Sequence, residues 1–241
     1  MKRTRGFTLI ELAIVLVVIT ILIGGLAVPL SAQIQTRRVA ETKQTLNEAR
    51  DAIYGYAMTH NSYDPNRRLL PCPDTTGDGR EDRDASDNAC IDYVGWLPWV
   101  DLGAAAQDAW GNRIRYAVHP PLARKSDGLP PPSAPTNMLL VCTLSTCTPN
   151  SPDVVADNVA FVLLSHGPNG WGGRNVNGST LAAPTGANEL ANLDTDRVYV
   201  SRPPSLPGQP AGEYDDIVQW TGYYGLIERI CPSGSACAPS P

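Results

Sequence analysis

Apolar residues dominate the N-terminal part of the chain. From Leu12 to Val28 no residue is charged, and Thr20 carries the only polar side chain. A run of this length is typical of a helix that crosses a bilayer. A short leader with three basic residues (Lys2, Arg3 and Arg5) precedes the run, and a basic flank of this kind stays on the cytoplasmic side.

Beyond Pro29 the pattern becomes amphipathic. The positions of one helical face recur at spacings of three and four: Val39, Thr42, Leu46, Ala49, Ile53 and Tyr56. No Gly/Ser/Pro linker lies between Leu30 and Tyr54. The pattern therefore predicts one long helix from about Phe7 to His60, kinked at Pro29 by the loss of one backbone donor. The alternative is a separate soluble helix after a linker.

The remaining residues, 61–241, alternate short apolar stretches with long loops, among them residues 120–135. The candidate strands are residues 114–118, 138–142, 159–164, 197–201 and 217–221. Sequential short strands favour an antiparallel sheet. With 241 residues the chain can form one membrane helix and one sizeable globular domain. The predicted class is α+β, a long N-terminal helix packed on a small antiparallel sheet.

Charge narrows the range of partners. The formal net charge is −5, and removal of Lys2, Arg3 and Arg5 would make it −5 − 3 = −8. An acidic domain argues against broad electrostatic binding of nucleic acid, which requires a basic face. A small local basic patch remains compatible with this composition.

Six cysteines, an even number, occur in a chain with an export-like N-terminus, and this combination favours disulfides. Six cysteines allow 15 connectivities. We predict the local pairs, which close short loops: Cys72–Cys90, Cys142–Cys147 and Cys231–Cys237. The alternative, a zinc site, prefers more closely spaced cysteine pairs than these.

An acidic segment suggests a second kind of site. With Gly79 as the sixth residue of an EF-hand-like loop, positions one, three, five and nine carry oxygen ligands: Asp74, Thr76, Asp78 and Asp82. Hard cations such as Ca²⁺ use such oxygen sets. The twelfth position is Ala85, so the usual bidentate glutamate is missing. Calcium binding and a solvated acidic turn therefore both remain open.

No pattern of catalytic residues emerges. The three histidines, His60, His119 and His166, show no metal-ligand spacing, and no nucleophile elbow, zinc-peptidase or phosphate-loop motif occurs. Ser165 and His166 are adjacent in sequence, but adjacency does not make a triad. We therefore expect that the protein is not an enzyme.

The stretch Gly6-Phe7-Thr8-Leu9-Ile10-Glu11 resembles the class III leader of type IV prepilins and type II secretion pseudopilins. The resemblance implies cleavage between Gly6 and Phe7 and N-methylation of Phe7. It also implies that Glu11, a charge beside an apolar segment, pairs with the terminal amine of a neighbouring subunit. The alternative is an ordinary signal peptide cleaved after Ala32, which would give a secreted or anchored domain without a filament.

Three further motifs resemble the major pseudopilin of type II secretion. Residues 108–116 resemble its DPWGNPYxY element, with Ala109 in place of proline; residues 161–170 resemble its SxGxDG strand and loop; residues 215–220 resemble its ADIxxW element. In that family the loop between the last two motifs binds calcium. Here Asn169 replaces the aspartate and residues 175–210 form a long insertion, so the resemblance carries over only Asp215 and Asp216 as ligands.

Together these features imply a type IV pilin-like fold: leader 1–6, transmembrane and filament-core helix 7–30, amphipathic continuation 31–60 and periplasmic β domain 61–241. The implied function is a minor pilin or pseudopilin in the inner membrane and then in the filament. Its partners would be other subunits, the prepilin peptidase, the assembly platform and membrane lipid. The alternative is a surface or tip pilin that binds an adhesion target, a secreted substrate or DNA.

Overall fold

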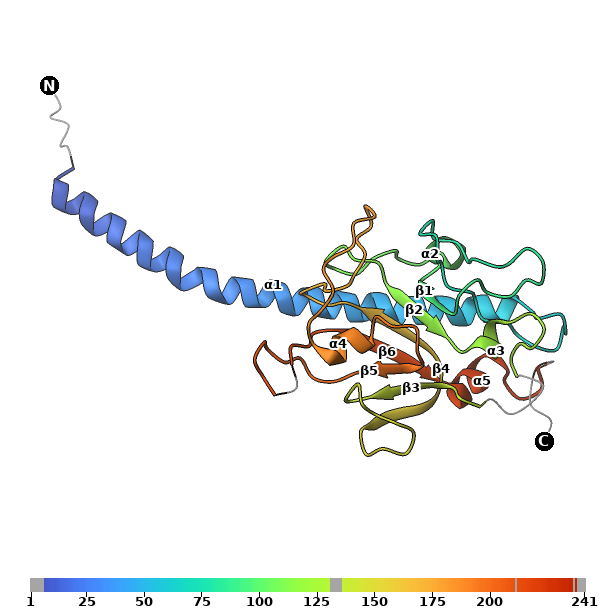
Figure 1. Ribbon diagram of the computed structural model, residues 1–241. Helices are drawn as coiled ribbons and strands as arrows, with labels where there is room; N and C mark the ends of the chain where they lie inside the picture. The colour runs from blue at the N-terminus through green and yellow to red at the C-terminus, as the bar shows by residue number, and fades with distance from the viewer. Residues whose placement is uncertain (1–6, 131–135, 211, 236, 238–241) are drawn as a thin grey trace, which may run out of the picture. The chain divides into compact units, whose positions relative to one another are not determined.

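A single helix opens the part of the chain that the computed structural model describes, which comprises residues 7–130, 136–210, 212–235 and 237. Helix α1 spans Leu9–Thr59, 51 residues (Figure 1). The prediction of one uninterrupted helix is thus confirmed, to within two residues at its start and one at its end. The chain forms two compact units, residues 1–40 and 41–241, and α1 contributes to both. The leader, including Gly6, lies outside the described residues.

The first unit is helical from Leu9 onward, and its apolar side chains are exposed from Phe7 to Ile23. Phe7 and Leu9 are 86% and 89% exposed. Within the described residues, no helix combines the length and the mean hydropathy that a membrane crossing requires. The transmembrane assignment of residues 7–30 therefore stays a prediction.

A six-stranded sheet forms the centre of the second unit, counted over the described residues. Its strands are β1 (Val94–Trp96), β2 (Arg115–Val118), β3 (Leu139–Cys142), β4 (Val154–Ser165), β5 (Val198–Val200) and β6 (Ile217–Gly222). The order is β1-β2-β4-β3-β5, and β6 pairs with β4. The prediction of an antiparallel sheet is confirmed for the pairs β1–β2, β2–β4, β3–β4 and β4–β6. The pairing of β3 with β5 departs from it, because it is parallel. A connection that contains all of β4 separates these two strands, which lets β5 return in the direction of β3.

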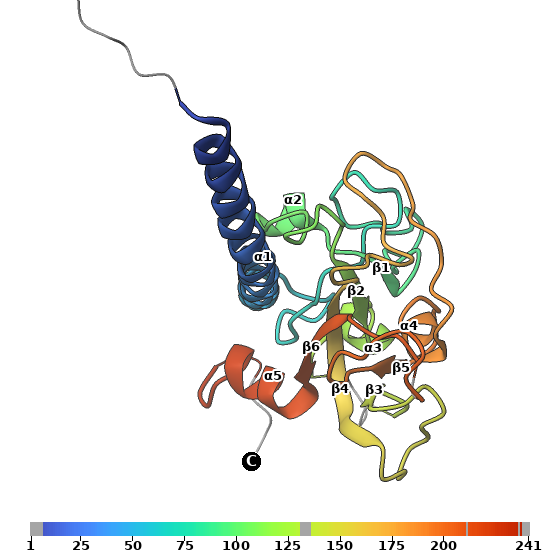
Figure 2. The same ribbon diagram turned by 90° about the vertical axis from the view of Figure 1, so that its left-hand side faces the viewer.

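Short helices occupy stretches that the sequence pattern assigned to loops or left unassigned: α2 (Trp99–Leu102), α3 (Pro120–Ala123), α4 (Ala187–Ala191) and α5 (Tyr223–Ile230). Helix α5 buries Leu226 and Ile230 against the same core as residues 46–57 of α1. Figure 2 shows α5 directly after β6, on the side of the sheet that faces these residues.

The core confirms the predicted amphipathic face from Thr42 onward, because its positions are buried within the second unit. On β4, Phe161 and Leu163 join the cluster formed with α1. Val162 points to the opposite face and packs beside Tyr199 of β5. This alternation is expected of a strand that is covered on both sides.

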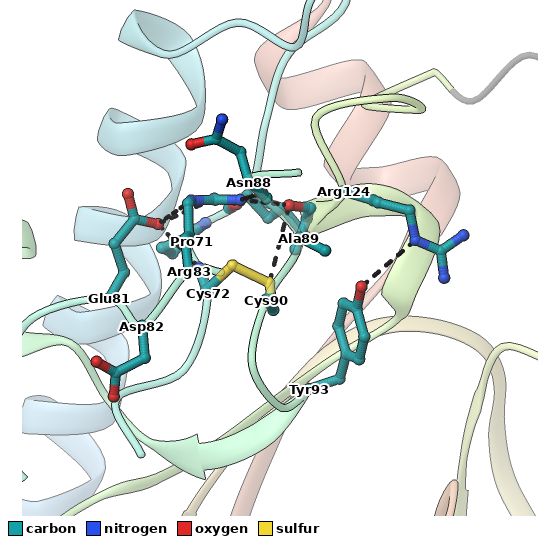
Figure 3. The surroundings of a disulfide bond; sticks show 12 residues. Pro71, Cys72, Glu81, Asp82, Arg83, Asn88, Ala89, Cys90, Tyr93 and Arg124 are labelled. Carbon is teal, nitrogen blue, oxygen red and sulfur yellow. Dashed lines mark hydrogen bonds and ion pairs between the residues drawn. A yellow bond between two sulfur atoms is a disulfide. The ribbon is translucent and has the colours of Figure 1, made fainter. Parts of the chain in front are cut away.

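All three predicted disulfides are present: Cys72–Cys90, Cys142–Cys147 and Cys231–Cys237. Beside the first lies the guanidinium group of Arg83 (Figure 3). It pairs with Glu81 at 2.9 Å and donates to three backbone carbonyls, those of Leu70, Asn88 and Ala123. Glu81 in turn accepts a hydrogen bond from Tyr56 of α1 at 2.8 Å. This network fixes the irregular segment after α1 to the helix.

Candidate functional site

The first of the three globular motifs forms a turn around Asp108. Its Oδ1 accepts hydrogen bonds from the backbone N–H groups of Trp110 and Asn112, and Gly111 adopts a positive φ of 88°. Asp108 Oδ2 accepts a hydrogen bond from the Ser165 hydroxyl at 2.6 Å, so the first motif is tied to the second. The backbone N–H of Ala109 donates to Thr42 of α1, which explains a polar residue on the buried helical face.

The second motif contacts the third through the loop that follows β4. Gly167 has a φ of 57°, and a Cβ atom there would lie 2.2 Å from the carbonyl oxygen of Asp215. Only glycine allows this approach. The backbone N–H of Asn169 donates to Asp215 Oδ2 at 3.0 Å. The three motifs, separated by up to about a hundred residues in sequence, thus converge on one place.

Three carboxylates meet there: Glu189, Asp215 and Asp216. One carboxylate oxygen of each residue lies within 4.8 Å of those of the other two. Among the described residues, these three side chains form the one group that could hold a metal ion. Glu189 belongs to α4 and is buried. We call these three residues the acidic cluster. Sequence reasoning identified Asp215 and Asp216 but missed Glu189, which lies inside the insertion.

Hydrogen bonds hold the acidic cluster in position. The backbone N–H of Asp215 donates to Glu189 Oε1 at 2.8 Å, and the side-chain amide of Asn169 donates to the same oxygen at 3.2 Å. The Asn192 side chain donates to Asp216 Oδ2 at 2.8 Å. Asn169 therefore acts as a donor to the cluster through both its backbone N–H and its side-chain amide.

The electrostatics of the acidic cluster are unfavourable to three negative charges. Burial, together with Glu189 and Asp216, raises the pKa of Asp215 to about 7. Burial and the neighbouring carboxylates also raise the pKa of Glu189. His166 Nδ1 lies 3.4 Å from Asp216 Oδ1. In addition, the buried Oδ1 of Asp215 has no hydrogen-bond partner among the described residues. Several carboxylate oxygens lie close together here, and their negative charges repel one another. Such a site suits a hard divalent cation such as Ca²⁺, which would neutralise this repulsion.

The acidic turn at residues 74–82 is built differently. Asp74 accepts hydrogen bonds from the backbone N–H groups of Gly77 and Gly79. Asp82 Oδ2 accepts from the backbone and hydroxyl of Thr75 at 2.6 and 2.7 Å. Asp78 caps the N–H of Arg80. Thr76 donates to Asp74 and Asp82. The carboxylates thus bond to their own turn, and among the described residues Asp74, Asp78 and Asp82 do not form a group of potential metal ligands. Calcium binding at this turn stays a prediction.

Ser165 and His166 do not face a common partner. The Ser165 hydroxyl is fully buried and donates to Asp108, whereas His166 faces Asp216. Ser165 therefore stabilises the motif turn, and His166 lies beside the acidic cluster.

The start of α1 forms a second candidate site. The backbone N–H and the hydroxyl of Thr8 both donate to Glu11 Oε2 at 2.8 Å, and the N–H of Glu11 donates back to the Thr8 hydroxyl at 3.4 Å. This reciprocal pattern is a capping box. Glu11 therefore stabilises the first turn of its own helix, a role that the sequence analysis did not identify.

Residues 1–27 match a family model described as the prokaryotic N-terminal methylation motif. No curated protein matches the chain. No solved structure matches it either. The match is confined to this N-terminal segment and supports a type IV prepilin-like protein. It supports a type IV pilin-like or pseudopilin subunit, and the α+β fold with its long N-terminal helix is consistent with a type IV pilin-like fold.

Proposed function

We propose that this protein is a structural subunit, a minor pilin or pseudopilin, of a type IV pilus or type II secretion pseudopilus. The prepilin peptidase cleaves it between Gly6 and Phe7 and methylates the amine of Phe7. The subunit resides in the inner membrane with its globular unit in the periplasm, and the assembly platform then adds it to the filament. The protein has no enzymatic activity of its own in this proposal.

One observation carries the proposal: a methylation motif leads into a helix whose apolar side chains are exposed from Phe7 to Ile23. Residues 12, 14–19 and 21–23 are each between 44% and 68% exposed. Burying apolar surface of this extent against like helices would drive assembly, at about 25 cal/mol per Å². The same surface would keep the unassembled subunit in lipid.

Glu11 sets the register of assembly in this proposal. The hydrogen bonds from Thr8 both reach Oε2, so a cation can approach the carboxylate from the side of Oε1. The methylated amine of a neighbouring subunit's Phe7 is such a cation, and it lies at the N-terminal end of that subunit's helix, the same end as Glu11. A charge in an apolar filament core is retained only with such a partner.

Two variants of Glu11 separate register from helix capping. Glu11→Gln keeps an acceptor for Thr8 but removes the charge, whereas Glu11→Ala removes both. We expect both variants to enter the membrane and both to be nearly absent from sheared filaments. Gln33→Ala, an exposed position on the same helix, is the matched control. Normal incorporation of Glu11→Gln would refute the charge-pairing role and leave only the cap.

The acidic cluster supports a second proposal, that the globular unit binds one Ca²⁺ ion through Glu189, Asp215 and Asp216. The unpartnered Oδ1 of Asp215 and the raised pKa values of Asp215 and Glu189 favour it. A cation would remove the repulsion among the carboxylates and join α4 to the segment before β6. Thermal unfolding of the Asp215→Asn variant with and without calcium tests this proposal.

A further inference from the structure

A short β-hairpin follows the second motif. A bridge pairs Arg174 with Thr180, and residues 176–183 are all exposed. Figure 1 shows the hairpin as an orange loop that stands away from the strands. Its tip contains Asn177-Gly178, one of two Asn-Gly pairs in the sequence. The tip is therefore open to solvent around a dipeptide whose side chain and backbone can react with each other.

Backbone hydrogen bonds define the shape of the tip. The N–H of Gly178 donates to the carbonyl of Asn175 at 2.9 Å, and the N–H of Asn175 donates to the carbonyl of Ser179 at 2.8 Å. Gly178 has a positive φ of 91°. This is the pattern of a three-residue hairpin loop, whose last position favours glycine. Because that residue has no Cβ, no side chain of its own shields its backbone nitrogen.

The side chain of Asn177 is held by its oxygen alone. Its Oδ1 accepts a hydrogen bond from the N–H of Ser179 at 3.0 Å, whereas its Nδ2 forms no hydrogen bond with any described residue. A donor at the oxygen draws electron density away from Cγ, which makes this carbon a better electrophile. The Nδ2 group is free to leave.

The other pair, Asn169-Gly170, is the internal contrast. Its glycine is buried, and the N–H of Gly170 donates to the carbonyl of His166 at 3.0 Å. The Nδ2 group of Asn169 donates to Glu189 of the acidic cluster. Reaction at this pair would require a packed loop to open, whereas reaction at Asn177 requires only an exposed tip to open, which costs less free energy.

A cation lies beside the exposed tip. A Cβ atom at Gly178 would lie 4.0 Å from Nη2 of Arg174. The guanidinium group of Arg174 is placed by its stacking on Trp96, 4.6 Å from the ring centroid. A cation at this position stabilises the negative charge that develops when a backbone nitrogen attacks a carbonyl carbon. It also stabilises a carboxylate formed afterwards.

We propose that Asn177 is a site of spontaneous modification, at which the folded chain converts this asparagine to aspartate and isoaspartate. The backbone nitrogen of Gly178 loses its proton to hydroxide and attacks Cγ of Asn177. A new C–N bond closes a five-membered succinimide, the Cγ–Nδ2 bond breaks, and the nitrogen takes up a proton and leaves as ammonia. Water then opens the succinimide at either of its carbonyls.

The product differs from the original chain in charge and in backbone. Each conversion adds one carboxylate, so the formal net charge of the full sequence becomes −5 − 1 = −6. Isoaspartate also places the side-chain methylene in the backbone, which alters the pairing at the tip. Water is the only co-reactant. The proposal does not depend on filament assembly, and each can fail without the other.

The test uses the purified full chain in detergent, incubated at pH 6 and pH 9, both folded and in urea. Peptide mapping by mass spectrometry measures the exchange of amide for carboxyl at each Asn-Gly pair, and an isoaspartate methyltransferase assay measures isoaspartate. Asn177→Gln prevents the five-membered ring. Arg174→Gln removes the neighbouring cation, and Arg197→Gln, which removes a cation from another loop, is the matched control. Thermal unfolding checks that each variant is folded.

We expect the folded chain to convert Asn177 at least about tenfold faster than Asn169, and faster at pH 9 than at pH 6, because the attacking nitrogen must lose its proton. In urea both pairs should react at similar rates. Arg174→Gln should slow the conversion of Asn177 by about two- to fivefold, the size of a screened surface charge interaction, and Arg197→Gln should leave it unchanged. Asn177→Gln should abolish the mass change at the tip.

Three results would overturn the proposal. The first is a folded chain in which Asn177 stays intact for the time that both pairs take to react in urea. The second is equal conversion of both pairs in the folded chain. The third is a glycan on Asn177 in protein from its own host, since Asn177-Gly178-Ser179 also matches the N-x-S acceptor pattern. An unchanged rate in Arg174→Gln would contradict the part assigned to the cation.

Discussion

Replacing Asp215 with asparagine should stabilise the metal-free protein at neutral pH. The change removes one of three clustered charges but keeps a side-chain oxygen that can accept from the N–H of Asn169. Because the folded-state pKa of Asp215, about 7, lies above the ordinary 3.8, ionisation of this group opposes folding. Its destabilising effect begins as the pH rises above about 4 and is complete above about 7.

The size of the effect follows from the pKa. A change from 3.8 to about 7 corresponds to an upper limit of about 4 kcal/mol, at about 1.4 kcal/mol per pKa unit. Asp215 is only half-buried, so solvent screens much of this repulsion. We expect about 1–2 kcal/mol at pH 7.5, or about 3–6 °C in the midpoint of thermal unfolding for a domain of this size.

The assay is thermal unfolding of the full chain in detergent, with EDTA or with calcium, at pH 5 and pH 7.5. In EDTA, Asp215→Asn should be more stable than the natural chain at pH 7.5, and its advantage should be less than half as large at pH 5. Calcium should stabilise the natural chain by about 2.7 kcal/mol at one hundred times its dissociation constant. The variant should gain little. Asp157→Asn, an exposed residue on β4, is the matched control.

Two results would refute this reasoning. If Asp215→Asn were less stable than the natural chain in EDTA at pH 7.5, the acidic cluster would not be repulsive. If calcium stabilised the variant as strongly as the natural chain, the ion would bind elsewhere, and the turn at residues 74–82 would become the first place to examine.

Three further changes test the globular unit by urea unfolding. Arg83→Met should cost about 3–5 kcal/mol, because it leaves the partly buried Glu81 carboxylate without its cation and three carbonyls without their donor. The exposed Arg80→Met should cost under about 1 kcal/mol, and equal losses would contradict the network. Joint replacement of Cys72 and Cys90 by alanine opens a loop that the disulfide closes over a sequence separation of 18. It should lower the free energy of unfolding by about 3 kcal/mol, and an unchanged urea midpoint would argue against this disulfide. Gly167→Ala should cost over about 2 kcal/mol, since its Cβ would overlap a backbone carbonyl. Calcium should not restore the lost stability. Full stability of this variant would mean that the loop can shift.

Helical periodicity and short cysteine loops were predictable because both depend on neighbours in sequence. Residues 42–56 show the helical spacing directly, and the local pairs of cysteines close short loops. Glu189 was not predictable, because it lies 26 residues before Asp215 in a stretch of weak pattern and α4 supplies its position. Its position beside the backbone N–H of Asp215 depends on tertiary contacts, which no local sequence pattern indicates.

The missed strand β1 has a similar explanation. It contains only three residues, and its central Gly95 has low strand propensity. Glycine is needed there because a Cβ atom would lie 2.5 Å from the carbonyl oxygen of Asp74. Pairing with β2 and contact with the acidic turn, both distant in sequence, create the strand. The parallel pairing of β5 likewise depends on the path of a long connection.

The most direct test of the proposed function is the intact mass of the protein isolated from membranes of its own host. We predict a mass that lacks residues 1–6 and carries one additional methyl group, which would establish processing between Gly6 and Phe7. A mass that begins at Gln33 would contradict the account and indicate an ordinary exported domain. The unprocessed mass of all 241 residues would contradict it as well, since Phe7 would then have no free amine to pair with Glu11.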